Sequence, residues 1–268
     1  MPLSPPPLSP PRRHPRSSAA TTRNRIGSYF RATREPRYSV LFALPLLLLY
    51  ESLAMVLGPV AGGVRNAADV VLRQLAYSIA GPYALPLLGA ALLGFGAWLV
   101  VRDARAHGWR MRPRWFGLML VESAVLAVVF GFVVATVTAN LLGVLTLAAQ
   151  SDAAPTGAAV WLMLSLGAGL YEELVFRVLL VTGITALGVR LLGMKRNASL
   201  ATAVVASAVL FSVAHHIGPF GDQWELPVLA YRFVAGLAFS AMYAVRGFGV
   251  TAWTHALYDV WVLVLRAL

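Results

Sequence analysis

The sequence predicts an all-α protein, a polytopic bundle of seven to eight transmembrane helices. Two observations lead to this prediction. Of 268 residues, 59% are hydrophobic and only 12% are charged, whereas a soluble domain has about 25% charged residues. Seven apolar runs also approach or exceed the roughly 20 residues that a helix needs to cross a bilayer. The chain has no cysteine, which excludes disulfides, iron–sulfur clusters, thiolate zinc sites and cysteine nucleophiles.

The first 37 residues are expected to form a disordered, basic, cytoplasmic tail. They contain eight arginines against one acidic residue, Glu35, and begin with a proline-rich stretch that cannot bury a core. Because the following residues enter the membrane, the tail is expected to contact anionic lipid headgroups and not nucleic acid. It is too long and polar for a removable signal peptide. Residues 38–268 are expected to form the transmembrane domain.

Each apolar run is expected to be one helix. The runs lie at about 39–59, 82–101, 115–141, 158–189, 199–216, 226–245 and 250–265. An eighth helix is indicated at 66–80, where Asp69, Arg73 and Gln74 occur at helical spacing among valines and leucines. This pattern fits an amphipathic helix at the membrane interface or a bundle helix with a polar face, and the interfacial interpretation is preferred.

Basic residues gather in alternate connections between these runs. Arginine is frequent in the tail, at 102–114 and at 190–196, whereas 150–156 and 218–225 contain acidic residues and no basic one. The positive-inside rule therefore predicts a multi-pass protein of the plasma membrane with its N-terminus in the cytoplasm. No internal repeat is visible, which disfavours an inverted-repeat transporter.

Three ionisable residues, Glu172, Glu173 and Arg177, lie within the run 158–189. At the centre of a membrane helix each ionised side chain costs about 2.5–3.5 kcal/mol, so they need partners or a function. Residues four apart share a helix face, which lets Glu173 pair with Arg177 and leaves Glu172 without a local counter-ion. A carboxylate facing a small wet chamber is one way to hold a general base.

Two later runs carry histidines at the same spacing. Phe211 shares a face with His215, and His255 shares a face with Asp259. With Glu172 these groups have the parts for activating water: a glutamate that removes a proton, a histidine that orients the water, and polar groups that stabilise an oxyanion. Glu172, His215 and His255 also match a two-histidine, one-carboxylate metal site. The sequence leaves open whether the site needs no cofactor or one divalent metal such as zinc.

Several polar groups have a simpler structural interpretation. Glu173 and Arg177 are expected to form a buried ion pair that supports the site, and His216 is expected to be an ordinary helix-end histidine. Three charged residues near span ends are expected to snorkel or to bond within the bundle: Glu51, Glu122 and Arg232.

Three short motifs thus follow one another: Glu-Glu-x-x-x-Arg at 172–177, Phe-x-x-x-His at 211–215 and His-x-x-x-Asp at 255–259. Their order and spacing resemble the CAAX protease and bacteriocin-processing family, which includes the type II CAAX prenyl endopeptidases, over a core of about 158–268. The resemblance implies an intramembrane endopeptidase acting on a membrane-associated protein or peptide, with a CAAX-like C-terminus as one candidate substrate class.

The resemblance also implies roles for the motif residues. Glu172 and His215 would activate water, while His255 and Asp259 would line the oxyanion site. Similar prenyl proteases commonly have Asn where Asp259 stands, and an ionised aspartate cannot donate a hydrogen bond to an oxyanion. Either Asp259 is protonated, or it orients His255 and leaves donation to the imidazole.

Two other functions remain open on the sequence alone. A non-enzymatic protein of the same fold, either a membrane scaffold or a bacteriocin self-immunity factor, would use the polar groups only to hold its helices together. A proton-coupled transporter would use Glu172 and the histidines as a proton relay.

The depth of the candidate residues in the membrane presents a difficulty. If every helix is straight, Glu172 falls near mid-membrane, His215 near the outer end and His255 near the inner end of their helices. A break near Gly167 or Gly169, or final helices entering at unequal depth, is expected to bring them to one level, since irregular backbone is tolerated where it lines a cavity.

Overall fold

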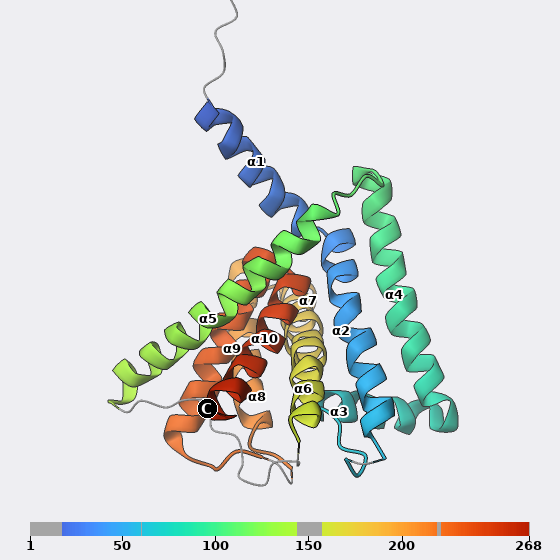
Figure 1. Cartoon of the computed structure of the whole chain (residues 1–268), viewed down its shortest axis with the longest axis vertical. Coiled ribbons are helices and arrows are strands. Elements are labelled where there is room, and N and C mark those ends of the chain that lie inside the picture. The colour runs from blue at the N-terminus through green and yellow to red at the C-terminus, as the bar shows by residue number, and fades with distance from the viewer. Residues whose placement is uncertain (1–17, 60, 144–156, 219–220, 268) are drawn as a thin grey trace, which may run out of the picture.

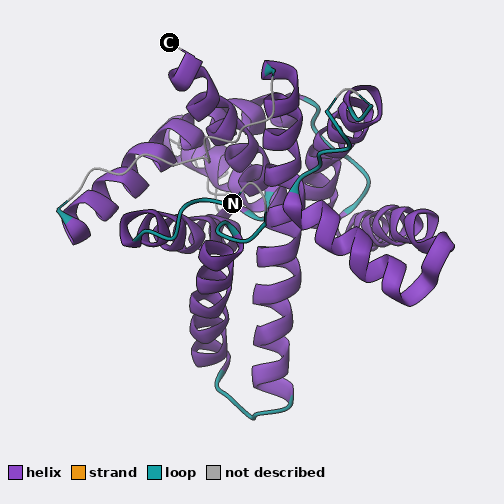
Figure 2. Cartoon of the chain, turned by 90° about the horizontal axis from the view of Figure 1, so that it is seen from below, coloured by secondary structure: helices purple, strands orange, loops and turns teal. Residues whose placement is uncertain are grey.

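The computed structural model describes all residues except 1–17, 60, 144–156, 219–220 and 268, which Figure 1 draws in grey. The described residues contain helices and loops and no strand (Figure 2), which confirms the predicted all-α fold. Five described segments are long and apolar enough to cross a membrane: Pro36–Leu57, Ala67–His107, Arg114–Leu142, Arg196–Ala214 and Leu226–Arg246.

Every apolar run found in the sequence is helical. Six of the runs correspond to single α-helices: α2 (Pro36–Leu57), α4 (Ala84–His107), α5 (Arg114–Leu142), α8 (Arg196–Ala214), α9 (Leu226–Arg246) and α10 (Phe248–Ala267). The run 158–189 is a chain of four helical segments: α6 (Ala158–Gly167), η2 (Ala168–Glu172), η3 (Leu174–Val181) and α7 (Thr182–Arg190).

Helix also extends into the expected tail. α1 (Ser18–Thr33) projects away from the rest of the bundle (Figure 1), and Arg37 is buried in α2. The end of α1 is fastened to the bundle because Tyr29 Oη donates a hydrogen bond to Glu122 Oε2 of α5 over 2.6 Å. Composition alone gives no sign of this bond. The part of the tail prediction that covers 1–17 lies outside the described residues.

The helix expected at 66–80 is α3 (Ala67–Ala80), which the turn η1 (Gly81–Tyr83) joins to α4. It lies near the lower ends of α2 and α4 in Figure 1. Its polar residue Asp69 is fully buried, whereas its exposed side chains include Val71, Leu75, Tyr77 and Ile79. An interfacial helix turns its polar face to water. The structure therefore favours the second alternative, a bundle helix whose polar face is turned inward.

The expected break at Gly167 or Gly169 does not occur. The helix continues through both glycines and widens to π-helical geometry from Ala168 to Glu172 and again from Leu174 to Val181, a local variation often found at functional sites. The glycines give room instead. A side chain at Gly167 would collide with Tyr50 and Asn66, and one at Gly169 would collide with α10.

The hairpin of α7 and α8 explains how distant polar residues reach one level. Glu172 lies 18 residues before Arg190, where α7 ends, and His215 lies 19 residues after Arg196, where α8 begins. Counted from the short connection between them, the two side chains are therefore at nearly equal depth. Two hydrogen bonds hold this register: Ser199 Oγ to Thr185 O at 2.9 Å and Ser207 Oγ to Phe176 O at 2.6 Å.

α10 is packed against α2, α5, α6 and α9 and lies in the middle of the bundle in Figure 1. It starts directly after α9, across Gly247, whose φ of 79° favours glycine. Hydrogen bonds to α2 hold its beginning, from Gly249 N to Ser39 Oγ at 2.6 Å and from Trp253 Nε1 to Phe42 O at 2.6 Å. These contacts carry His255, two turns into α10, to the level of Glu173.

Candidate active site

Glu172 is the last residue of η2 and is 9% exposed. Its Oε1 accepts a hydrogen bond from Asn66 Nδ2 at 2.9 Å. Its Oε2 lies 3.6 Å from His215 Nε2 and 3.9 Å from His255 Nε2, and this buried oxygen has no hydrogen-bond partner among the described residues. The two oxygens thus differ, since one is held by an amide and the other faces two imidazoles.

His215 directly follows α8 and caps its C-terminus. Its Nδ1 lies 2.7 Å from the carbonyl oxygen of Phe211. A carbonyl can only accept, so Nδ1 carries the proton, and in the neutral ring Nε2 keeps its lone pair. This nitrogen faces Glu172. Phe211 and His215, predicted to share a helix face, are therefore in direct contact.

His255 is held from two sides. Its Nδ1 donates to Glu173 Oε1 over 2.7 Å, and its ring stacks on Phe239 with centroids 4.3 Å apart. A carboxylate that binds one ring nitrogen fixes the orientation of the imidazole and directs the other nitrogen to the site. Here that nitrogen is Nε2, which faces Glu172 Oε2.

Glu173 and Arg177 are both fully buried, and Arg177 Nη1 lies 3.0 Å from Glu173 Oε1. The guanidinium also lies 4.5 Å from the centre of the Phe211 ring and donates to the carbonyl of Gly236 at 3.3 Å. The predicted ion pair is thus present. Glu173 has a second contact that the sequence does not indicate, because the same oxygen accepts from His255.

Comparison with protein-family models gives one match, to the family described as Rce1-like, Type II CAAX prenyl endopeptidase Rce1-like, over residues 154–261. This region contains Glu172, His215, His255 and Asp259. The matched region is similar to the type II CAAX prenyl endopeptidases that this family model describes. Comparisons with curated proteins and with solved structures return no match. At the family level, the match supports a CAAX-type intramembrane endopeptidase.

Asp259 is the position at which the sequence departs from the pattern that the resemblance implies. The structure brings Asp259 Oδ2 to 3.7 Å from His255 Nε2, with 19% of the side chain exposed. That separation is too long for a hydrogen bond. Asp259 therefore lies beside His255 without bonding to it. We use the name Glu172 cluster for Glu172, Glu173, His215, His255 and Asp259.

The Glu172 cluster offers donor types that a divalent metal accepts, although the ligand atoms of Glu172, His215 and His255 do not all lie within 4.8 Å of one another. An unpartnered carboxylate oxygen faces two imidazole nitrogens, and these are the donor types of a two-histidine, one-carboxylate site. A metal there would be held by Glu172, His215 and His255. When bound, it would supply Lewis acidity, polarising a carbonyl and making bound water more acidic.

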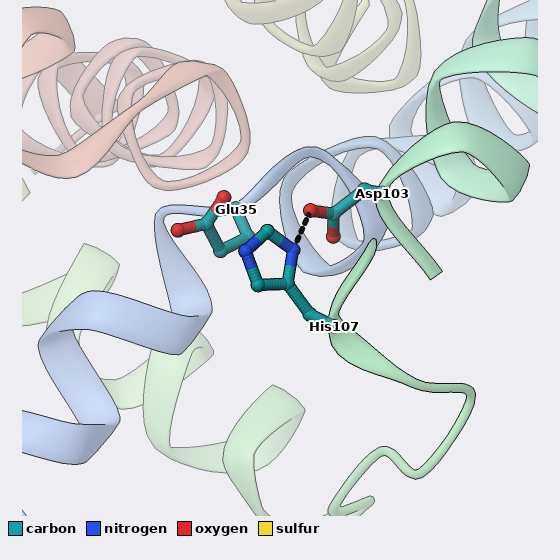
Figure 3. A group of neighbouring side chains, drawn as sticks. All are labelled: Glu35, Asp103 and His107. Atoms are coloured by element: carbon teal, nitrogen blue, oxygen red, sulfur yellow. Dashed lines mark hydrogen bonds and ion pairs between the residues drawn. The ribbon is translucent and has the colours of Figure 1, made fainter. Parts of the chain in front are cut away.

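A group with metal-ligand spacing lies elsewhere in the described residues. Ligand atoms of Glu35, Asp103 and His107 are all within 4.8 Å of one another, and Figure 3 shows the imidazole between the side chains of Glu35 and Asp103. Asp103 Oδ1 is already bonded to His107 Nδ1 at 2.8 Å, and Oδ2 lies 3.5 Å from Arg37 Nε. These contacts describe an ion-pair network that fastens α4 to the start of α2.

The remaining predicted polar residues bond within the bundle, as expected. His216 Nδ1 donates to the carbonyl of Asp222 at 3.0 Å, as a helix-end histidine would. The three charged residues near span ends all have partners: Glu51 with Arg65 and Arg73, Glu122 with Arg246, and Arg232 with Asp222.

The sequence did not indicate that Asn66 and Phe239 contact the site residues Glu172 and His255. The pattern Asn66 to Asp69 signals a helix start, since asparagine is a favoured N-cap, and Asn66 does cap α3. Nothing in that pattern indicates a bond to Glu172, 106 positions away. Phe239 is one of several aromatic residues in an apolar run, and spacing does not single it out.

Proposed function

We propose that this protein is an intramembrane endopeptidase that hydrolyses a peptide bond of a membrane-associated protein or peptide, with a CAAX-like C-terminus as one substrate class. The observation that carries the proposal is the unpartnered Oε2 of Glu172, which faces the Nε2 atoms of His215 and His255. A buried acceptor left without a partner is costly, and a water hydrogen-bonded between these atoms would satisfy it.

In the proposed reaction, Glu172 Oε2 removes a proton from that water while His215 Nε2 accepts its other hydrogen as a hydrogen bond. The water oxygen bonds to the scissile carbonyl carbon and forms a tetrahedral oxyanion. Glu172 then passes its proton to the amide nitrogen, the carbon–nitrogen bond breaks, and a carboxylic acid and an amine are released. The proton that Glu172 takes up is thus the one that the leaving amine receives.

His255 is proposed to stabilise the oxyanion. Because its Nδ1 donates to Glu173, donation from Nε2 requires the imidazolium form. The carboxylates of Glu172, Glu173 and Asp259 surround the ring and stabilise that positive charge. Asp259 is proposed to act through His255, because an ionised carboxylate cannot itself donate to the oxyanion.

The test is comparative proteomics of membrane peptides from cells that contain the parent or Glu172→Gln, which keeps the shape of the side chain and removes the base. We expect new peptide ends with the parent and none with the variant. Glu225→Gln makes the same change at an exposed residue and should cleave like the parent. If Glu172→Gln produces the same ends, the enzymatic proposal fails and a scaffold role for the cluster is the better explanation.

A chelator arm of the same experiment addresses the metal. Cleavage that persists in the chelator and stops in Glu172→Gln supports water activated by Glu172 and His215 alone. Cleavage that stops in the chelator and returns with added zinc supports a metal held by Glu172, His215 and His255.

We further propose a plasma-membrane location with the N-terminus in the cytoplasm. The basic ends of α7 and α9, at Arg190 and Arg246, and the arginine-rich connection 108–113 lie on the side where α2 begins, which the positive-inside rule assigns to the cytoplasm. The chain has no cysteine, so a maleimide can label the protein only at an introduced cysteine. Trp109→Cys should react with an impermeant maleimide only after permeabilisation, and Trp224→Cys in intact cells; both tryptophans are exposed. The reverse pattern would invert the topology.

A further inference from the structure

Asn66 lies outside the family-matched region and contacts the proposed general base. It caps α3, is 7% exposed, and its Nδ2 donates to Glu172 Oε1 at 2.9 Å. This hydrogen bond holds Glu172 Oε1. The first half of the chain therefore contributes directly to the setting of a residue in the second half.

The orientation of the Asn66 amide is determined by its other bonds. Asn66 Oδ1 accepts from the backbone N–H of Ala68 at 2.9 Å. Since a backbone N–H can only donate, the oxygen must lie on that side and the NH₂ group must point to Glu172. The backbone N–H of Asn66 donates to Tyr50 Oη at 3.1 Å, which fixes the residue at a third point.

A closed group of charged residues supports this arrangement. We use the name α2–α3 cluster for Glu51, Arg65, Asp69 and Arg73. Tyr50 Oη donates to Asp69 Oδ2 at 2.8 Å, while Arg65 and Arg73 each bridge Asp69 and Glu51. The cluster therefore holds Tyr50, and Tyr50 in turn holds Asn66.

The same cluster reaches the helix that carries Glu172. Tyr171 Oη, next to Glu172 in the chain, donates to Glu51 Oε1 at 2.7 Å. Gly167 lies one turn away, and a Cβ there would come within 2.9 Å of Asn66 Cβ. The absence of a side chain at Gly167 is thus what allows Asn66 to approach.

We infer that Asn66 is a positioning residue of the active site, which holds Glu172 Oε1 so that Oε2 alone faces His215 and His255. The inference rests on the proposed function, because it assigns a task to Oε2. A neutral amide suits this task. It fixes the carboxylate with one hydrogen bond and brings no cation that would compete with the histidines for its charge.

The test uses Asn66→Ser and Asn66→Asp. Both replacements are good N-caps and can still accept from Ala68 N–H, but neither has the amide donor. With a peptide copied from a cut site of the parent, we expect kcat to fall on the order of 10- to 100-fold, the scale of a misplaced catalytic group, while KM stays within about twofold because Asn66 touches no substrate.

The matched control is Asn140→Ser, at an exposed asparagine whose amide donates to the carbonyl of Thr136; it should behave like the parent. Gly167→Ala is a second test, since the added methyl meets Tyr50 and Asn66 and displaces this pair without changing either residue, and it should lower kcat in the same way. Parent-like kcat in Asn66→Ser and Asn66→Asp overturns the inference, and so does a loss of rate that only matches a loss of folded protein.

A substrate-independent measurement separates this inference from the proposed function. The infrared carboxylate band of Glu172, identified as the one missing in Glu172→Gln, should shift in purified Asn66→Ser and stay in place in Asn140→Ser. An unshifted band overturns the role of Asn66 whether or not the protein cleaves peptides. Failure of the proposed function appears instead as cleavage that survives Glu172→Gln.

Discussion

Two polar clusters adjoin each other in this bundle, and they differ in how completely their hydrogen bonds are satisfied. In the α2–α3 cluster both carboxylates accept bonds from both arginines, and tyrosines complete the set. In the Glu172 cluster, the buried atoms Glu172 Oε2 and Glu173 Oε2 have no hydrogen-bond partner among the described residues. Buried polar atoms in native proteins are seldom left in that state.

This difference indicates that the α2–α3 cluster has a supporting role and that the Glu172 cluster is the one able to react. A fully bonded cluster rigidifies its surroundings and has nothing left to offer a substrate. A cluster with an open acceptor can take a water molecule or a reacting group, as catalytic sites must. The two are joined by Asn66 and Tyr171, so the satisfied cluster holds the unsatisfied one in place.

The largest effect is expected from Arg177→Met, at the ion-pair partner of Glu173 in the Glu172 cluster. Arg177 is fully buried, and removing one partner of a buried ion pair costs about 3–5 kcal/mol, since the other charge is left behind. We expect lower abundance in the membrane and a lower thermal unfolding temperature of the detergent-purified protein, together with loss of cleavage.

The double variant Glu173→Leu with Arg177→Met distinguishes stability from function. Replacing both charges by apolar groups is often neutral or stabilising, so the unfolding temperature should recover. Cleavage should not recover, because His255 loses the carboxylate that orients it. If the double variant cleaves like the parent, the orienting role of Glu173 is refuted.

The fold was largely predictable from sequence, because apolar runs and helical spacing are local properties. All seven runs are helices, and Glu173 with Arg177 and Phe211 with His215 make the contacts that a spacing of four residues implies. Contacts between helices are not local. The meeting of Glu172 with His215 depends on a hairpin register counted from 191–195, whereas the argument from membrane depth expected a break near Gly167 or Gly169, or unequal helix depth, to bring them to one level.

An intermediate effect is expected from Arg73→Met in the α2–α3 cluster. The methionine keeps much of the length of the side chain but removes a charged donor from Asp69 and Glu51. A hydrogen bond to a charged group is worth about 1.5–3 kcal/mol, and the lower end applies because Arg73 is 25% exposed. The unfolding temperature should fall modestly.

Cleavage per folded molecule should be nearly unchanged in Arg73→Met, because Arg65 still bonds Asp69 and leaves Tyr50 and Asn66 in place. This outcome would distinguish the supporting cluster from the Glu172 cluster. A loss of cleavage as large as that of Glu172→Gln, with the protein still folded, would contradict the division between the two.

The inward polar face of α3 and the role of Asn66 could not be read from the sequence for a related reason. Amphipathic spacing shows that Asp69, Arg73 and Gln74 share a side of a helix, but the same pattern fits a helix facing water and one facing a polar bundle interior. Only the partners on other helices, Glu51 and Tyr50, decide between these, and they lie on a separate run.

The smallest effect is expected from His107→Ala, outside both clusters. His107 bonds Asp103, but 53% of its side chain is exposed, and exposed pairs contribute about 0–1 kcal/mol. Stability and cleavage should remain close to those of the parent.

The variant is informative because Glu35, Asp103 and His107 have metal-ligand spacing (Figure 3), and a metal bound there would confuse any chelator experiment. A ligand that binds only the folded state raises its stability, so the unfolding temperature of parent and His107→Ala should respond equally to added zinc. If zinc stabilises only the parent, this network binds metal, and a chelator effect on cleavage could no longer be assigned to Glu172, His215 and His255 without repeating it in His107→Ala.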